Sequence, residues 1–180
     1  MEKTGAGRKI VVVLLCILSF FLVMHKEEKE TAVNHEKADM TEYNLQSHCY
    51  YESSVKDIIQ MKDDRQTFVV LFGYSDCDAC QKAVPALLEA AEEKNVDTIY
   101  YINTRKKKSW TKNTDIDDYD LLVDWLEGYL SEDENGNPYL YVPYVLFVKD
   151  GSLKAVHTAG TDYTDEELTQ VFLDDLSLIE

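Results

Sequence analysis

Cys77 and Cys80 are the residues of this sequence best suited to chemistry. They stand as Cys-Asp-Ala-Cys after a run of β-forming residues, 67–74, and before a helical pattern that runs to about Lys94. A cysteine at the amino end of a helix meets unpaired backbone N–H groups and the positive end of the helix dipole, and both favour the thiolate. A second cysteine one turn later is close enough to resolve a mixed disulfide. The spacing therefore predicts thiol–disulfide exchange by Cys77 and Cys80, with no cofactor beyond their own redox-active disulfide.

Three features in this order resemble the thioredoxin family. They are the strand with Cys77-x-x-Cys80, then Pro85 in the following helix, then Val142-Pro143 ahead of a strand and the turn at 149–151. The resemblance implies a thioredoxin fold, which is an α/β fold with a central mixed sheet flanked by helices. It also implies a cis peptide bond before Pro143. The implied substrate groove beside the cysteines is bordered by Tyr74, Val142, Pro143 and Gly160.

The sequence also departs from the thioredoxin pattern. Leu71 falls where thioredoxins keep a buried acid, so fast reduction of the thioredoxin type is not expected. The chain is most similar to membrane-anchored thioredoxin-like proteins of Gram-positive bacteria, the bacteriocin transport accessory proteins. That similarity rests on an apolar N-terminal segment, a Tyr-x-x-Cys-x-x-Cys motif and a long insert at about 103–137. It implies exported proteins or peptides as substrates.

Charged residues next to Cys77 are expected to modulate its pKa. The negative charges of Asp76 and Asp78 disfavour the thiolate and oppose the helix dipole, while Lys82 offsets part of this effect. We therefore expect the pKa of Cys77 to lie nearer that of an ordinary thiol than in strongly oxidising family members. The protein is then expected to be fairly reducing, as a reductase or an isomerase.

Length and charge limit the function classes further. The chain has 180 residues and a formal net charge of −16, from 18 basic and 34 acidic residues. Such a length suits one domain with a tail, and such a charge excludes nucleic-acid binding, which needs a basic surface. No nucleotide-binding fingerprint is present, so a separate redox partner is expected to recycle the cysteines.

The N-terminal part predicts export of the domain. Residues 10–24 form an uncharged apolar run that follows Arg8 and Lys9, which predicts a single-pass anchor over residues 1–25 with a cytoplasmic N-terminus. A cleaved signal peptide is the alternative, and Cys16 raises a third possibility, lipid modification. A charged linker is expected at 26–42 and the thioredoxin-like domain at 43–180. The domain is then extracytoplasmic at the cell membrane.

Hydrophobic patterns predict the remaining elements. Helices are expected at 53–62, 77–94, 117–130 and 165–176, and strands at 67–74, 97–102, 144–148 and 152–157. On the third helix, the apolar face is expected to include Tyr129. Residues 131–138 are expected to form a loop. Residues 135–142 are expected to border the substrate groove.

Other functions remain open alternatives at this stage. The chain is alternatively a non-catalytic thioredoxin-like adaptor or accessory module for peptide export. His48 and Cys49 with the cysteine pair are a second alternative, a zinc site, although no metal is expected. Cys49 is otherwise a small buried residue or a regulatory partner of Cys77. The basic run 105–108 is either a solvated loop or a docking patch for an acidic partner or anionic lipid.

Overall fold

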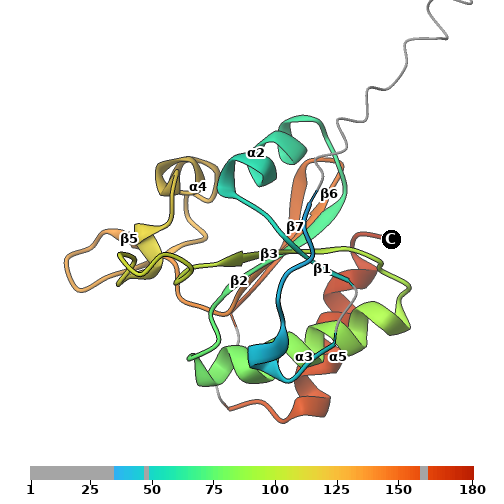
Figure 1. Ribbon diagram of the computed structural model, residues 1–180. Helices are drawn as coiled ribbons and strands as arrows, with labels where there is room; N and C mark the ends of the chain where they lie inside the picture. The colour runs from blue at the N-terminus through green and yellow to red at the C-terminus, as the bar shows by residue number, and fades with distance from the viewer. Residues whose placement is uncertain (1–34, 47–48, 159–161) are drawn as a thin grey trace, which may run out of the picture. The chain divides into compact units, whose positions relative to one another are not determined.

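A five-stranded mixed sheet forms the centre of the fold, in the order β1-β3-β2-β6-β7 (Figure 1). The structure, a computed structural model, describes residues 35–46, 49–158 and 162–180. The strands of this sheet are β1 (Tyr50–Glu52), β2 (Phe68–Gly73), β3 (Ile99–Asn103), β6 (Tyr144–Lys149) and β7 (Ser152–Thr158). The pairs β1–β3 and β3–β2 are parallel, whereas β2–β6 and β6–β7 are antiparallel.

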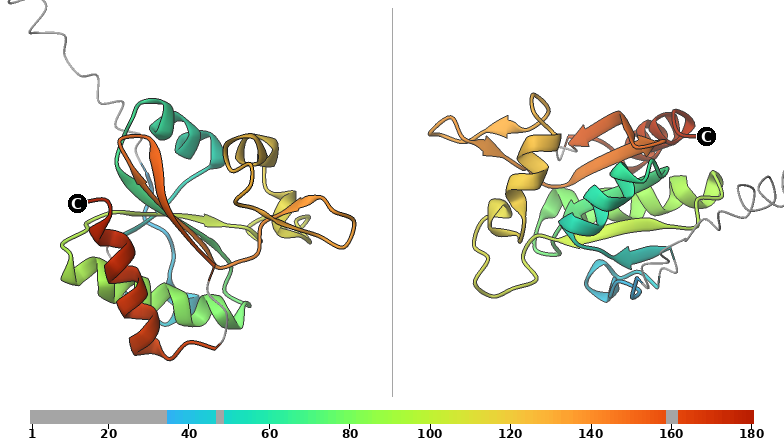
Figure 2. Two further views of the ribbon diagram at one scale, coloured as in Figure 1. Left: turned by 180° about the vertical axis from the view of Figure 1, so that it is seen from behind. Right: turned by 90° about the horizontal axis from the view of Figure 1, so that it is seen from above.

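Helices cover both faces of the sheet (Figures 1 and 2). α3 (Asp78–Glu93) and α5 (Asp165–Ser177) pack together on one face, and α2 (Val55–Asp63) and α4 (Tyr119–Trp125) lie on the other. β2 lies between them with all six residues buried, and its side chains alternate between two cores. Val69 and Leu71 face the α3 side, and Val70 faces the α2 side. This two-sided burial explains the uninterrupted apolar run before the cysteines.

The expected fold class and most of its elements are confirmed. The observed sheet and helices have the arrangement of a thioredoxin fold, and the strands and helices bracketing the cysteines differ from expectation only by a residue or two at their ends. The Val142–Pro143 peptide bond is cis, as expected. α5 begins with a capping box in which Thr164 and Glu167 exchange hydrogen bonds.

The N-terminal edge of the sheet was not predicted. β1 has only three residues, too few to show an alternating pattern, and becomes recognisable as a strand only through its pairing with β3. Residues 35–42 also differ from the expected linker. Lys37 bridges to Tyr51, Ala38 and Met40 are buried, and the 3₁₀ helix η1 (Thr41–Tyr43) packs near α3. Residues 35–42 therefore belong to the folded part of the chain, whereas they were expected to be linker.

The predicted helix at 117–130 is wrong at both ends. α4 spans only seven residues, because Asp118 before it is left-handed at φ 60° and Gly128 after it has φ +80°. Gly disfavours helix and readily adopts positive φ. Consequently Leu126 is buried, but Tyr129 is 58% exposed instead of facing the core.

The expected loop at 131–138 is a small hairpin. β4 (Ser131–Glu132) pairs antiparallel with β5 (Pro138–Tyr139). The Asp133 carboxylate closes the turn by accepting hydrogen bonds from the backbone N–H groups of Asn135 and Asn137. A second 3₁₀ helix, η2 (Asn113–Asp115), precedes α4, so the insert has structure of its own. Figure 2 shows the insert at the side of the sheet away from α5.

The predicted anchor at 1–25 lies outside the described residues, and so does the rest of the chain before His35. Within the described residues, no helix is both long and apolar enough to cross a membrane.

Candidate active site

The two cysteines lie where the central strand β2 ends and α3 begins. Cys77 is the N-cap of α3, and its Sγ accepts a hydrogen bond from the backbone N–H of Cys80 at 3.3 Å. On its other side, Cys77 Sγ lies 3.7 Å from the carbonyl oxygen of Val142. Both cysteines are thiols in this structure, Cys77 half-buried and Cys80 buried. The first is therefore reachable from solvent and the second is held behind it.

The surroundings of Cys77 favour its thiolate. The pKa of Cys77 is lowered to about 6, chiefly because the Cys80 thiol donates to its sulfur, with further help from the backbone N–H groups of Cys80 and Ala79. Burial and the negative charge of Asp78 act in the opposite direction. The expected influence of Asp78 is thus present but is outweighed. The resulting pKa is lower than about 7, as in thioredoxin, and higher than about 3.5, as in a strong oxidant.

Cys80 is a protected, protonated thiol. Its pKa is raised, first because it donates to Cys77 and second because it is buried. Gly73 at the end of β2 makes room for it, since a Cβ there would lie 3.2 Å from Cys80 Sγ and 3.4 Å from Leu71. Leu71 is fully buried in the same core, so it presents an apolar side chain near Cys80.

A buried pair of tyrosines lies behind the cysteines and was not predicted. The hydroxyl groups of Tyr43 and Tyr101 are 3.0 Å apart, and Tyr101 donates to the carbonyl of Gly73 at 3.4 Å. Burial is the main reason that the pKa of both phenols is raised. Both hydroxyl groups are therefore neutral, and they are polar groups in the otherwise apolar surroundings of the Cys80 thiol. The sequence gives no signal for them, because Tyr43 and Tyr101 are 58 residues apart and only the fold brings their hydroxyl groups together.

The cis-proline segment lies next to Cys77. Pro143 is buried just before β6, and Val142 before it is half-buried against both cores. The guanidinium of Arg105 lies 4.8 Å from the ring centroid of Tyr74. Tyr141, which is 50% exposed, has its ring 4.6 Å from that of Tyr139. Two tyrosines thus immediately precede the segment that contacts Cys77.

Asn113 joins these parts and was missed in the sequence. Its side chain is buried, and its Nδ2 donates to the carbonyl of Leu140 at 3.0 Å. Its Oδ1 accepts from Thr104 Oγ1 at 3.2 Å and from Arg105 Nε at 3.3 Å. Thr104 in turn donates its backbone N–H to Gly73. One amide therefore ties the cis-proline segment to the strand ends beside the cysteines.

The N-terminal arm also contacts the cysteine loop. Ser75 Oγ donates to the carboxylate of Glu42 at 2.6 Å, and Gln81 Nε2 donates to the carbonyls of both Ser75 and Glu42. These bonds fix the turn that carries Cys77.

The other predicted site residues are placed as follows. Asp76 is exposed in the turn before Cys77. Lys82 donates its ammonium to the carbonyl of Tyr163 at 3.3 Å, toward the start of α5. Gly160, expected at the groove, lies outside the described residues.

Cys49 does not share a site with the pair. It precedes β1, whose Tyr50 is level with Ile99, whereas Gly73 before the cysteines is level with Asn103. In parallel strands that offset of four residues is about 13 Å along the sheet, so the regulatory disulfide with Cys77 is not supported. Residues 35–46, 49–158 and 162–180 contain no group of three His, Cys, Asp or Glu side chains able to hold a metal ion. His48 of the zinc alternative is not described.

No protein-family model and no curated protein matches the chain. Among solved structures, it is similar to oxidized thioredoxin O2 from Arabidopsis thaliana, with 17% identity, a TM-score of 0.46, and coverage of 74% of this chain and 96% of that one. It is also similar to oxidised thioredoxin from Plasmodium falciparum, with 15% identity, a TM-score of 0.40, and coverage of 71% and 97%. Thioredoxin O1 from Arabidopsis thaliana has 16% identity, a TM-score of 0.43, and coverage of 70% and 96%.

The fold assignment rests on the molecule itself. The mixed sheet in the order β1-β3-β2-β6-β7, the cysteine pair where β2 meets α3, and the cis bond before Pro143 occur together. The described part of the chain is a mixed α/β sheet flanked by helices, arranged as in a thioredoxin fold.

Proposed function

We propose that this chain is a thiol–disulfide oxidoreductase in which Cys77 is the nucleophile and Cys80 the resolving thiol. The observation that carries the proposal is the environment of Cys77 Sγ. It lies at the amino end of α3, within 3.3 Å of a backbone N–H, beside a thiol that donates to it, and its pKa is lowered to about 6. At neutral pH such a sulfur is largely thiolate, the nucleophilic form.

The first step is attack by the Cys77 thiolate on one sulfur of a substrate disulfide. A Cys77–substrate disulfide forms, the substrate S–S bond breaks, and the other substrate sulfur leaves as a thiolate that takes a proton from solvent. The carbonyl of Val142, 3.7 Å from Cys77 Sγ, belongs to a backbone edge on which an extended substrate segment can form hydrogen bonds.

The second step is attack by Cys80 on Cys77 Sγ. Cys80 loses its proton, the Cys77–Cys80 disulfide forms, and the second substrate sulfur leaves as a thiolate. The substrate disulfide has gained two electrons and the cysteine pair has lost two. Leu71 is apolar and cannot take the proton of Cys80, so this proton passes to the leaving substrate thiolate.

The proposal extends to substrates, partners and location. We propose that the domain is held outside the cytoplasm by residues 1–25 and acts on thiols or disulfides of exported proteins or peptides. A separate thiol partner then reduces or oxidises the pair again. The similarity to bacteriocin transport accessory proteins makes a secreted peptide the favoured substrate.

The test is turnover of a protein disulfide, with insulin as substrate and dithiothreitol as reductant. The full chain is expected to accelerate insulin reduction, and Cys77→Ser is expected to abolish the acceleration. Cys80→Ser is expected to stop turnover but to accumulate a mixed disulfide through Cys77, visible by mass spectrometry. Cys49→Ala is the matched control and is expected to retain activity, since Cys49 precedes the opposite end of the sheet.

Equal insulin reduction with and without Cys77 would contradict the proposal. In that case, if the chain still binds the substrate, the non-catalytic adaptor becomes the better description.

A further inference from the structure

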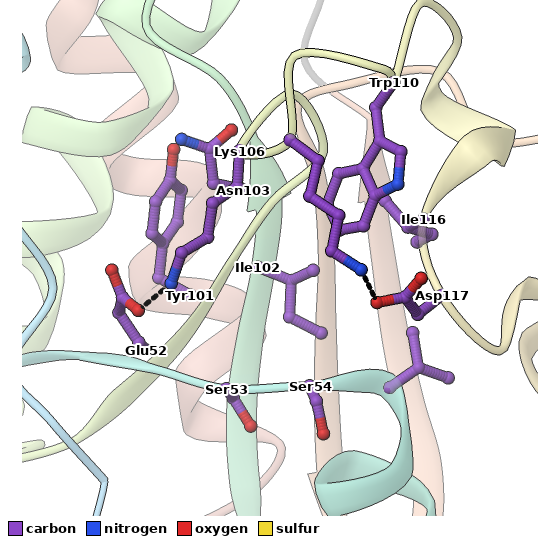
Figure 3. Close-up of a pocket in the computed structure, with 12 residues that line it drawn as sticks. Glu52, Ser53, Ser54, Tyr101, Ile102, Asn103, Lys106, Trp110, Ile116 and Asp117 are labelled. Atoms are coloured by element: carbon purple, nitrogen blue, oxygen red, sulfur yellow. Dashed lines mark hydrogen bonds and ion pairs between the residues drawn. The ribbon is translucent and has the colours of Figure 1, made fainter.

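A cavity of about 250 Å³ opens at the carboxyl ends of β1 and β3, where the insert begins (Figure 3). Neither Cys77 nor Cys80 lines it. At roughly 30 Å³ for each water molecule, it has room for about eight waters, which is the scale of a small organic molecule and less than a drug-sized one. The cavity is therefore a separate candidate site.

The inner wall of the cavity is apolar. Ile102 of β3 and Ile116 of the insert are both buried, and the indole of Trp110 lies beside them. In Figure 3, Trp110 and Ile116 lie near Asp117, and Ile102 lies between this group and Tyr101. An indole with two branched aliphatic side chains favours a planar apolar ligand, because ring faces pack well on both.

The rim carries two lysines of the basic run, each in an exposed ion pair. Lys106 pairs with Glu52, and Lys107 pairs with Asp117 on the other side. The lysine side chains are 58% and 51% exposed. Exposed pairs of this kind contribute little stability, so an incoming anion can replace either carboxylate. The long lysine stems can follow a ligand, whereas the shorter carboxylate side chains are held closer to their backbone.

We propose that this cavity binds a small aromatic molecule that carries one anionic group. The ligand's ring packs against Ile102 and Trp110, over whose ring the Lys107 ammonium lies at 4.8 Å, and the anionic group is bound by Lys106 and Lys107. The residues of the basic run 105–108 thereby have different roles. Arg105 stacks on Tyr74 beside the cysteines, and the next two lysines serve the cavity. Lys108 follows them, is exposed, and is not part of the cavity.

The test is calorimetric titration of the full chain with three naphthalene probes that differ only in charge. They are 2-naphthoate, neutral 2-naphthalenemethanol and cationic 2-naphthylmethylammonium. We expect 2-naphthoate to bind with one-to-one stoichiometry and at least about tenfold more tightly than the other two. In a Trp125→Phe background Trp110 is the only tryptophan, and its fluorescence is expected to change on binding.

Variants at the exposed lysines locate the site without disturbing the core. The double replacement Lys106→Gln, Lys107→Gln is expected to reduce the affinity for 2-naphthoate to that for the alcohol. Lys108→Gln, one residue further along, is the matched control and is expected to bind as the unmodified chain does. Trp110→Ala is expected to weaken the binding of 2-naphthoate and of 2-naphthalenemethanol.

Three results would overturn the proposal. They are no saturable binding of 2-naphthoate, equal or tighter binding of the neutral or cationic probe, and binding that survives both the lysine and the Trp110 replacements. Cys77→Ser is expected to leave the affinity unchanged, so the result is independent of the proposed thiol chemistry.

Discussion

At the scale of single residues, the chemistry depends on which groups donate to one sulfur. The backbone N–H groups of Ala79 and Cys80 and the Cys80 thiol all stabilise the Cys77 thiolate, against the charge of Asp78. The sequence indicates the helix end and the acidic neighbour. It does not show that the Cys80 thiol lowers the pKa of Cys77 most, because that depends on the direction in which the Cys80 side chain points.

The pH dependence of Cys77 reactivity follows from its lowered pKa. The rate of Cys77 alkylation by iodoacetamide is expected to rise with pH, reach half its maximum near pH 6 and level off above about pH 7, because only the thiolate reacts. Asp78→Asn removes an opposing charge and is expected to move this midpoint to lower pH. Mass spectrometry of the alkylated peptide measures both curves. A midpoint near about 8.5, the pKa of a free cysteine, would show that the donors do not act on Cys77.

Asn113 is expected to be a positioning residue of the groove. Asn113→Asp retains the oxygen that accepts from Thr104 and Arg105 but loses the donor to the Leu140 carbonyl. Leaving that buried carbonyl without a partner costs about 1–3 kcal/mol in unfolding free energy. The KM for insulin is expected to rise severalfold.

Alkylation of Cys77 separates this role from general damage. In Asn113→Asp the alkylation midpoint is expected to stay at that of the unmodified chain, because Asn113 makes no contact with Cys77 through these bonds. A loss of thiolate reactivity with no change in KM would show that Asn113 does not position the groove.

At the scale of elements, the insert distinguishes this domain from a minimal strand–helix scaffold. The insert contains the short α4, the 3₁₀ helix η2 and strand β4, and its Arg105 contacts the ring of Tyr74, three residues before Cys77. The sequence indicates that an insert exists but not its form. That form depends on two residues with positive φ, Asp118 and Gly128, and on the turn that the Asp133 carboxylate closes. The spacing of apolar residues predicts none of these features.

Tyr141 is expected to contribute to substrate recognition. Tyr141→Ala removes a half-exposed ring next to Val142, whose carbonyl adjoins Cys77. The kcat/KM for insulin is expected to fall about three- to tenfold, since one aromatic contact contributes about 0.5–1.5 kcal/mol. Turnover of a small disulfide such as oxidised glutathione is expected to be unchanged. Tyr129→Ala, an equally exposed tyrosine of the insert, is the control, and an equal loss there would contradict a specific role for Tyr141.

The turn between β6 and β7 requires glycine for two reasons. Gly151 has φ +73°, and a Cβ there would lie 2.3 Å from the carbonyl oxygen of Lys62 at the end of α2. Gly151→Ala is therefore expected to lower the unfolding free energy by more than about 2 kcal/mol, as strain and overpacking add. Gly128→Ala shares the positive φ but meets no atom within 4 Å, so it is expected to lose about 1 kcal/mol. Urea denaturation compares the two, and equal losses would refute the clash.

At the scale of the whole molecule, much of the fold follows from the sequence. The buried run at β2, the cysteines after it and the Pro143 hairpin are long or distinctive signals, and all are observed. The parts that were missed depend on contacts between distant segments. β1 is defined by pairing with β3, Tyr43 by its bond to Tyr101, and Asn113 by its bond to Leu140. No local pattern encodes these pairings.

The pKa of Cys77 also changes the expected redox behaviour of the whole protein. A thiolate that is stabilised in the reduced form makes the disulfide a stronger oxidant. The pKa of Cys77 is lowered below that of an ordinary thiol, against the expectation from Asp76 and Asp78, so we expect a less reducing protein than those two charges alone suggest. Such a poise suits an isomerase as well as a reductase.

The reduction potential of the full chain in glutathione buffers tests the central claim most directly. The account predicts a single two-electron transition of the Cys77–Cys80 pair, at a potential between about −270 mV, as in thioredoxin, and about −120 mV, as in a strong oxidant. The transition is expected to vanish in Cys80→Ser. The absence of any reversible Cys77–Cys80 disulfide, or a potential outside that interval, would contradict the account.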